Sequence, residues 1–191
     1  MPRRRVHLHT SGLSSPDSRT VGDQNSEATE IITRLEMTSP DQLVPGEPSP
    51  VPVMLVEIGP DSASVVRSTY VRIWTPLRAH GRMEWSDDEW AAELSSPAVR
   101  CWLARVEGET AGFVELENGT TGEVGIVVFG LVPEYQGRGF GAAFLAGATA
   151  RAWEIGDPTK RVWLQTSSDD HAHALTNYRR RGFRTFSTEG Q

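Results

Sequence analysis

Apolar residues are distributed unevenly along the chain, and their spacing predicts where strands and helices lie. Residues 1–29 are rich in Ser, Thr, Asp, Gly and Arg and contain few large apolar side chains. Such a segment cannot bury enough surface to offset the entropy lost on ordering, so we expect a disordered tail. Residues 30–191 are expected to form one folded domain, within which residues 39–52 are a proline-rich, extended connector.

Apolar runs bounded by turn residues predict the β-strands, and the loose alternation in the first of them indicates an edge strand. The predicted strands cover 31–37, 53–58, 101–106, 111–116, 124–131, 162–166 and a last strand that starts at 183–186. Helical spacing and capping residues predict helices over 61–73, 86–94, 139–153 and 171–181. Antiparallel strands followed by alternating strands and helices predict an α/β fold with a mixed sheet and helices on its faces.

A glycine-rich segment separates a predicted buried strand from the helix that follows it. Residues 136–141 read Gln-Gly-Arg-Gly-Phe-Gly and come shortly after the apolar strand 124–131. Glycines uncover backbone N–H groups and adopt positive φ, and a helix start carries about half a positive charge. Together these features favour binding of a phosphate or pyrophosphate, with Arg138 as an additional cation. Gly130, near the end of the strand, indicates a bulge or the close approach of another segment.

Two other nucleotide-binding motifs do not fit this segment. A P-loop needs Gly-Lys-Ser/Thr at the start of its helix, whereas residues 139–141 are Gly-Phe-Gly. The Rossmann motif needs Gly-x-Gly-x-x-Gly, but the glycines within residues 137–141 are two positions apart throughout. The segment alone therefore indicates only a phosphate near a helix N-terminus.

Two motifs in the second half of the chain resemble those of the GNAT superfamily of N-acetyltransferases. The acetyl-CoA loop of that family reads Gln/Arg-x-x-Gly-x-Gly/Ala, and residues 136–141 match every fixed position. The family often carries Asn-x-x-Ala-x-x-x-Tyr-x-x-x-Gly-Phe downstream, where residues 171–183 have His171 in place of the asparagine. The positions of this second motif that match are Ala174, Tyr178, Gly182 and Phe183.

The resemblance implies a mixed, mostly antiparallel GNAT-type sheet flanked by helices on both faces, and an acetyl-CoA-dependent acyltransferase. An acetyl group would pass from acetyl-CoA to a primary amine of a small molecule or protein by direct attack. Tyr178 matches the general acid that protonates the departing thiolate, although a half-buried tyrosine that packs on Phe183 would follow the same pattern. The residues that the resemblance places at the cofactor are Leu131, Val132, Gln136, Gly137, Arg138, Gly139, Phe140, Gly141 and His171.

The general base is defined less well than the acid. An amine with a pKa of about 10.4 is neutral in only about one molecule in a thousand at pH 7, so a base has to remove its proton. Many family members carry a glutamate on the central strand where this chain has Gly125. The candidate bases are Glu123, two residues earlier on the same strand face, and Glu115, with Glu117 or a water chain as further options. Each carboxylate also fits a solvated position at a strand end.

Composition argues against some classes of binding partner and indicates a location in the cell. The net charge is −6, from 19 basic and 25 acidic residues, which argues against nucleic-acid binding and against an anionic membrane surface. No apolar run reaches about 18 residues and no apolar segment follows the basic start, so a cytoplasmic location is expected. Cys101 is the single cysteine, and His171 and His173 are too close to face the same way on a helix, so no metal site is expected. A homodimer is left open.

Two other functions stay open beside the acetyltransferase. The first is a catalytically weak acyl-CoA-binding sensor or regulatory module, because Gly125 replaces the usual glutamate. The second is a nucleotide-binding regulatory domain that takes ATP or NAD. Residues 179–181, all arginine, fit either a solvated helix face or a contact with the 3′-phosphate of CoA. The acceptor region holds several tryptophans that fit either the core or an aromatic acceptor pocket: Trp74, Trp85 and Trp90.

Overall fold

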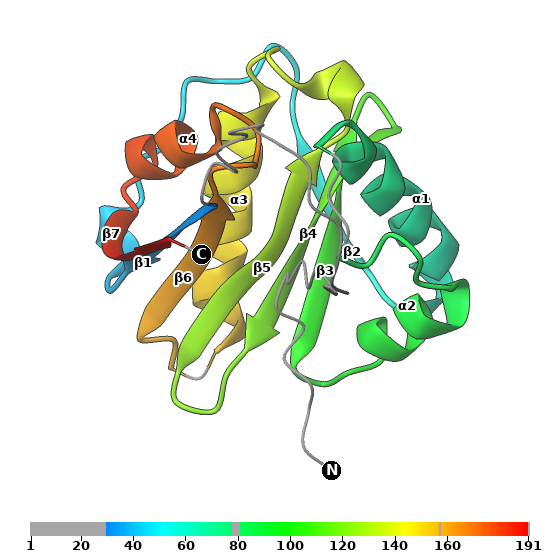
Figure 1. Ribbon diagram of the computed structural model, residues 1–191, viewed down its shortest axis with the longest axis horizontal. Coiled ribbons are helices and arrows are strands. Elements are labelled where there is room, and N and C mark those ends of the chain that lie inside the picture. The colour runs from blue at the N-terminus through cyan, green and yellow to red at the C-terminus, as the bar shows by residue number, and fades with distance from the viewer. Residues whose placement is uncertain (1–29, 78–80, 157, 191) are drawn as a thin grey trace, which may run out of the picture.

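The computed structural model describes residues 30–77, 81–156 and 158–190, so the predicted tail, residues 1–29, lies outside the described residues. They form a seven-stranded sheet in the order β2-β3-β4-β5-β6-β1-β7, with helices on both faces (Figure 1). Neighbouring strands are antiparallel except for β5 and β6, which are parallel. The predicted α/β fold with a mixed, mostly antiparallel sheet is confirmed.

The observed elements agree with the predicted ones to within a few residues at each end. The strands are β1 (Ile31–Met37), β2 (Met54–Ile58), β3 (Val99–Val106), β4 (Glu109–Asn118), β5 (Glu123–Leu131), β6 (Arg161–Ser167) and β7 (Arg184–Gly190). The α-helices are α1 (Ala63–Trp74), α2 (Asp87–Leu94), α3 (Phe140–Ile155) and α4 (Ala174–Arg180). Within the described ranges, no helix combines the length and apolarity needed to cross a bilayer.

Local sequence signals explain several of these boundaries. Ser86 and Glu89 form the predicted capping box, with each side chain accepting a hydrogen bond from the other residue's backbone N–H. Glu107 and Gly108 have φ values of 51° and 87°, which suits the tight turn between the paired strands β3 and β4. The start of α4 differs from the prediction, because residues 171–173 form a turn in which Ala174 N–H donates to the His171 carbonyl.

The position of β1 corrects one prediction. The alternation in residues 31–37 indicated an edge strand, but β1 lies between β6 and β7 and pairs antiparallel with both. Its residues Leu35 and Met37 are fully buried. On this side of the sheet the edge strand is β7, most of whose residues are exposed. A strand pattern reports which side chains are buried, whereas the partners of β1 come from the far end of the chain.

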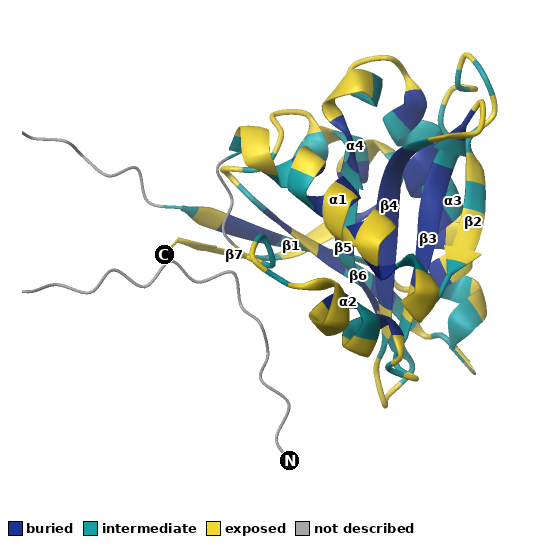
Figure 2. Ribbon diagram, turned by 90° about the vertical axis from the view of Figure 1, so that its right-hand side faces the viewer, coloured by how far each residue is buried: buried dark blue, intermediate teal, exposed yellow. Residues whose placement is uncertain are grey.

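Two apolar clusters lie on opposite faces of the sheet, and β3 and β4 run between them as buried strands (Figure 2). The first cluster packs α3 and α4 against one face, with fully buried Phe144 and Leu145 at its centre. The second packs α1 and α2 against the other face around fully buried Trp90 and Phe113. The sheet therefore has a helix layer on each side, and the chain that leaves β5 for α3 passes from one layer to the other.

The proline-rich connector spans the sheet from β1 to β2. It holds one short 3-10 helix, Pro40–Gln42, and otherwise no regular structure, as predicted for an extended connector. Leu43 and Val51 pack against the cluster under α3 and α4. Figure 1 shows this segment, coloured cyan, crossing the end of the molecule at which α3 begins. The connector is thus part of the fold and borders the glycine-rich segment.

Candidate active site

The two parallel strands at the centre of the sheet separate part-way along their length. Residues Glu123 to Ile126 of β5 pair with Arg161 to Leu164 of β6, and the pairing stops there. Beyond that point β5 continues against β4 as far as Leu131, and β6 continues against β1. The strands diverge toward the end of the sheet at which α3 begins (Figure 1). Backbone groups on the facing sides of the two strands are therefore available to a ligand in the part that is split.

A β-bulge accompanies the split. Glu115 pairs with Val128 and Leu116 with Ile126, so Val127 is the extra residue on β5. A bulge bends its strand and increases the local twist, which turns β5 away from β6. The bulge lies at Val127 and not at Gly130, which pairs regularly with Phe113. Gly130 instead meets the other prediction made for it, a close approach, since a Cβ there would lie 2.7 Å from Ile73 Cγ2 of α1.

The glycine-rich segment forms a loop directly before α3. Gly137 and Gly139 have φ values of 68° and 86°, in the left-handed region that favours glycine. Gly139 is the N-cap residue of α3, and Gly141 lies in the first helical turn. Among the backbone hydrogen bonds of the turns and loops in the described ranges, none is donated by an N–H group of residues 137–141. Those N–H groups, at the positive end of the helix dipole, form a site suited to a phosphate.

Two side chains brace this loop. Gln136 donates from Nε2 to the Leu131 carbonyl at 2.7 Å, which ties the loop to the end of β5. Arg138 donates from Nη1 to the Glu134 carbonyl at 2.9 Å, and its guanidinium lies 5.6 Å from the Tyr135 ring centroid. Both side chains thus make contacts within the protein.

The end of β5 presents the backbone of Leu131 to the split. The N–H of Val132 donates to the Ala111 carbonyl at 2.8 Å, and its carbonyl accepts from Tyr135 N–H at 3.0 Å, so both groups of Val132 are engaged. Because facing directions alternate along an antiparallel pair, the N–H of the preceding residue, Leu131, points away from β4 and toward the split. Of the two predicted residues, Leu131 is thus the one with a backbone donor available to a ligand.

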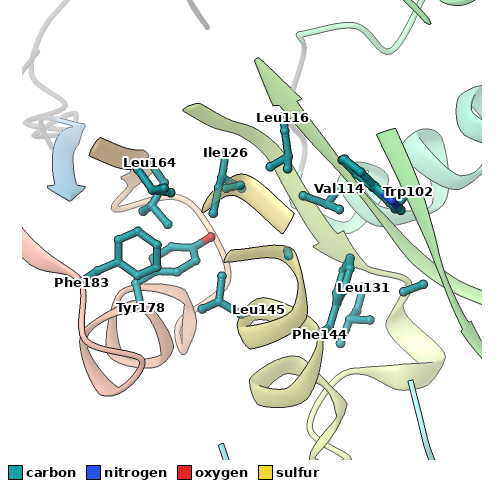
Figure 3. Close-up of a cluster of buried hydrophobic side chains, with 14 of the residues drawn as sticks. Trp102, Val114, Leu116, Ile126, Leu131, Phe144, Leu145, Leu164, Tyr178 and Phe183 are labelled. Atoms are coloured by element: carbon teal, nitrogen blue, oxygen red, sulfur yellow. The ribbon is translucent and has the colours of Figure 1, made fainter. Parts of the chain in front are cut away.

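Tyr178 of α4 lies behind the split, against β5. Its ring centroid is 6.3 Å from that of Phe129 on β5 and 6.4 Å from that of Phe183. Figure 3 shows the ring within the apolar cluster and its hydroxyl directed toward Ile126, near the point at which β5 and β6 part. Burial, and then the charge of Asp170, raise the pKa of Tyr178 above its ordinary value, so the hydroxyl keeps its proton. The hydroxyl is therefore a weaker acid than that of an exposed tyrosine.

The family of the chain follows from a comparison of this region with known sequences. The acetyltransferase (GNAT) family matches residues 66–183, which span the split strands, the glycine loop and α4. The chain belongs to the GNAT family. No curated protein sequence matches it.

Solved structures that resemble this GNAT chain share its fold at low sequence identity. A GCN5-related N-acetyltransferase from Kribbella flavida is 20% identical, with a TM-score of 0.60 over 85% of this chain and 58% of that one. The corresponding protein from Sphaerobacter thermophilus is 17% identical, with a TM-score of 0.64 over 85% and 50%. The chain thus spans about half the length of these two proteins. The ribosomal-protein-S18-alanine N-acetyltransferase from Escherichia coli is 18% identical, with a TM-score of 0.57 over 71% and 80%.

The position of the usual GNAT glutamate is filled by a neighbouring side chain. A Cβ at Gly125 would lie 2.9 Å from Cζ2 of Trp163 on β6, so the indole covers the place where a longer side chain would stand. Glu123, on the same strand face, lies where β5 and β6 are still paired and accepts from Arg161 Nη1 at 3.0 Å. The structure therefore places Glu123 in an ion pair at the closed part of the strand pair, away from the split.

Glu115 is a buried ion-pair partner. Its side chain is 1% exposed, and its two oxygens accept from Nη1 and Nη2 of Arg82 at 2.7 and 3.0 Å. The same guanidinium bonds Glu93 at 3.3 Å and lies 4.6 Å from the Trp85 ring centroid. Burial raises the pKa of the Glu115 carboxyl, and the Arg82 guanidinium opposes that rise. Glu115 is placed to hold the segment between α1 and α2 against β4.

The tryptophans of the expected acceptor region belong to the apolar cluster that packs α1 and α2 against the sheet. Trp90 is fully buried, and the rings of Trp85 and Trp90 pack edge to face at 5.1 Å. Trp74 stacks on Tyr70 with centroids 4.4 Å apart. These contacts favour the core interpretation of the tryptophans over an aromatic acceptor pocket.

Other polar contacts join α4 to its surroundings. His171, exposed in the turn before α4, accepts from His173 N–H at 3.3 Å. Asn177 donates from Nδ2 to the Gly141 carbonyl at 3.3 Å, which joins α4 to the first turn of α3. Asp170 accepts from Thr166 Oγ1 at 2.7 Å at the end of β6. No periodic signal marks Asn177, because it acts through one contact with a distant segment. Asp170 acts locally, since it also accepts from Ser167 N–H at 2.9 Å.

Removing Arg82 should destabilise the fold strongly. In Arg82→Met the Glu115 carboxylate stays buried without its partner, so we expect the free energy of unfolding to fall by about 3 kcal/mol. The loss should shrink at acidic pH, since burial raises the pKa of Glu115 and its protonation removes the uncompensated charge. Urea unfolding at pH 5 and pH 8 measures both effects.

The matched control is Arg67→Met. Arg67 pairs with Asp87 across 3.4 Å, and both side chains are about half exposed, so its loss should cost at most about 1 kcal/mol. The double variant Arg82→Met/Glu115→Leu should recover much of the stability. A single variant at Arg82 as stable as the Arg67 control would show that the buried pair does not anchor the α1–α2 segment.

Proposed function

We propose that this chain is an acetyl-CoA-dependent N-acetyltransferase that acts on a primary amine of a small molecule or a protein. The observation that carries the proposal is the split between β5 and β6, with the glycine loop at its end and the Tyr178 hydroxyl behind it. Membership of the GNAT family supports it. A cytoplasmic location and a homodimer stay predictions.

Each part of acetyl-CoA has a counterpart among the residues. The diphosphate would be held by the uncovered N–H groups of residues 137–141 and by the dipole of α3. The pantetheine arm would lie in the split, where Leu131 N–H can donate to one of its amide carbonyls. Gln136 and Arg138 would act by bracing the loop in the form that presents those N–H groups.

The reaction needs two proton transfers. The neutral amine attacks the acetyl carbonyl carbon, the carbon–sulfur bond breaks, and the electron pair leaves on the CoA sulfur. Tyr178 would donate its proton to that sulfur, since its raised pKa keeps the hydroxyl protonated across the working range. The amine loses a proton as the amide forms, and a water that reaches solvent is the acceptor most compatible with the positions of Glu115 and Glu123.

A second function is supported by the same carboxylates. Glu115 is bound to Arg82, Glu123 is bound to Arg161, and Trp163 covers Gly125. A chain that binds acyl-CoA and transfers slowly, as a sensor, is consistent with a site in which Glu115 and Glu123 are both held in ion pairs. The names of similar proteins, an IAA acetyltransferase from Bacillus cereus and the S18-alanine enzyme, offer acceptor classes with which to separate the two functions.

One experiment distinguishes an enzyme from a sensor. Purified protein is incubated with acetyl-CoA and a panel of small primary amines and peptides with free N-terminal alanine, and products are read by mass spectrometry. We expect an acetylated amine together with stoichiometric release of CoA thiol. Binding of acetyl-CoA by calorimetry with no product from any amine would support the sensor, and competition by ATP or NAD would support a nucleotide-binding domain.

A further inference from the structure

Arg181, the residue that follows α4, is a half-buried arginine that forms no ion pair with any residue of the described ranges. Its Nε and Nη1 atoms are buried and have no hydrogen-bond partner within the described ranges. The two preceding arginines differ from it, because Arg179 donates to Thr185 Oγ1 and Arg180 is exposed. Guanidinium N–H groups that are buried without a hydrogen-bond partner are costly, so this arrangement calls for an explanation.

The guanidinium lies between the connector and the first turn of α3. A Cβ at Gly46 would clash with Nη1 of Arg181 and would lie 2.7 Å from Cβ of Ala142, the third residue of α3. The connector also holds the backbone at this point, because Val44 N–H donates to the Arg181 carbonyl at 3.0 Å. Gly46 therefore leaves the space that the guanidinium fills beside the start of α3.

The helix start makes this position worse for a cation. The N-terminus of α3 carries partial positive charge and uncovered N–H groups, so it repels Arg181 and attracts anions. An anion placed there would satisfy the helix start and the guanidinium together. The glycine loop, at which the diphosphate would bind, leads into this same turn.

We propose that Arg181 is a phosphate-binding residue of the cofactor site, and that it pairs with the diphosphate of CoA at the glycine loop. The inference rests on the proposed function, because it takes CoA as the ligand. The connector positions this residue through Val44 and Gly46, and the cofactor supplies the counterion.

The test compares Arg181→Met with Arg180→Met, which removes the neighbouring exposed charge. We expect the first variant to bind CoA about 10- to 100-fold more weakly, as for the loss of a charge-assisted hydrogen bond, and the second to bind within about twofold of the native protein. Arg181→Lys, which keeps the charge, should recover part of the affinity. The CoA-free Arg181→Met protein should melt at the native temperature or higher, because it no longer buries two guanidinium nitrogens without partners.

The outcomes separate this inference from the proposed function. A loss of affinity that persists with 3′-dephospho-CoA supports the diphosphate as the partner, and a loss that disappears with it overturns that choice. Equal CoA binding by the native and Arg181→Met proteins overturns the role of Arg181 while the proposed function stands. A lower melting temperature of the CoA-free variant would indicate a structural role. A native protein that does not bind CoA at all would overturn both proposals.

Discussion

Replacing Gly139 by aspartate should abolish CoA binding, with affinity reduced at least about 100-fold. The substitution places a carboxylate at the N-cap of α3, next to the N–H groups that would hold the diphosphate. Two effects act in the same direction: the N-cap carboxylate occupies the helix donors itself, and it repels the phosphates by several kcal/mol at close range. Isothermal titration calorimetry with CoA measures the loss.

Gly108→Asp is the matched control for this experiment. Gly108 has a φ of 87°, against 86° for Gly139, so an aspartate at either position carries the same backbone strain. Gly108 lies in the turn between β3 and β4, and a Cβ there would meet nothing within 4 Å. The control should lose a similar amount of stability and keep its affinity for CoA. Equal affinity of the two variants would remove the glycine loop from the site.

Much of the fold could be predicted because it is encoded locally. Periodicity located the strands and helices, and the capping box at Ser86 and the turn at Gly108 set individual boundaries. The order of the strands is a different kind of information, since β1 takes both its partners from the last part of the chain. Nothing in residues 31–37 themselves distinguishes an edge strand from an internal one that happens to alternate.

The candidate site also combines a part that is encoded locally with a part that depends on distant residues. The glycine loop was predictable because a short run of residues creates its chemistry. The candidate bases were not, because the state of Glu115 depends on Arg82, 33 positions away along the chain. One signal was present: Glu115 stands between apolar residues Val114 and Leu116 in a strand buried on both faces, and a carboxylate in such a run requires a cation. The sequence does not say which arginine supplies it.

Tyr178 is the proposed proton donor of the reaction. Tyr178→Phe should lower the rate of acetyl transfer about 100-fold and leave the dissociation constant of CoA nearly unchanged. The ring would keep its contacts with Phe129 and Phe183, and the hydroxyl makes no hydrogen bond within the described part of the chain, so folding should change little. Stopped-flow or steady-state thiol release gives the rate, and calorimetry gives the affinity.

Tyr135→Phe serves as the control for this variant. It removes a hydroxyl beside the glycine loop, from a ring whose centroid lies 5.6 Å from that of Phe140. The control should retain the native rate.

The pH profile of the transfer rate adds an independent check. The proton-bearing form of Tyr178 is the active one, and its pKa is raised above the ordinary value of 10, so the native rate should not fall between pH 7 and pH 10 through its ionisation. A fall in that window that Tyr178→Phe abolishes would contradict the raised pKa. Equal losses of rate and CoA affinity would instead make Tyr178 a structural residue, and the transfer would then need another acid.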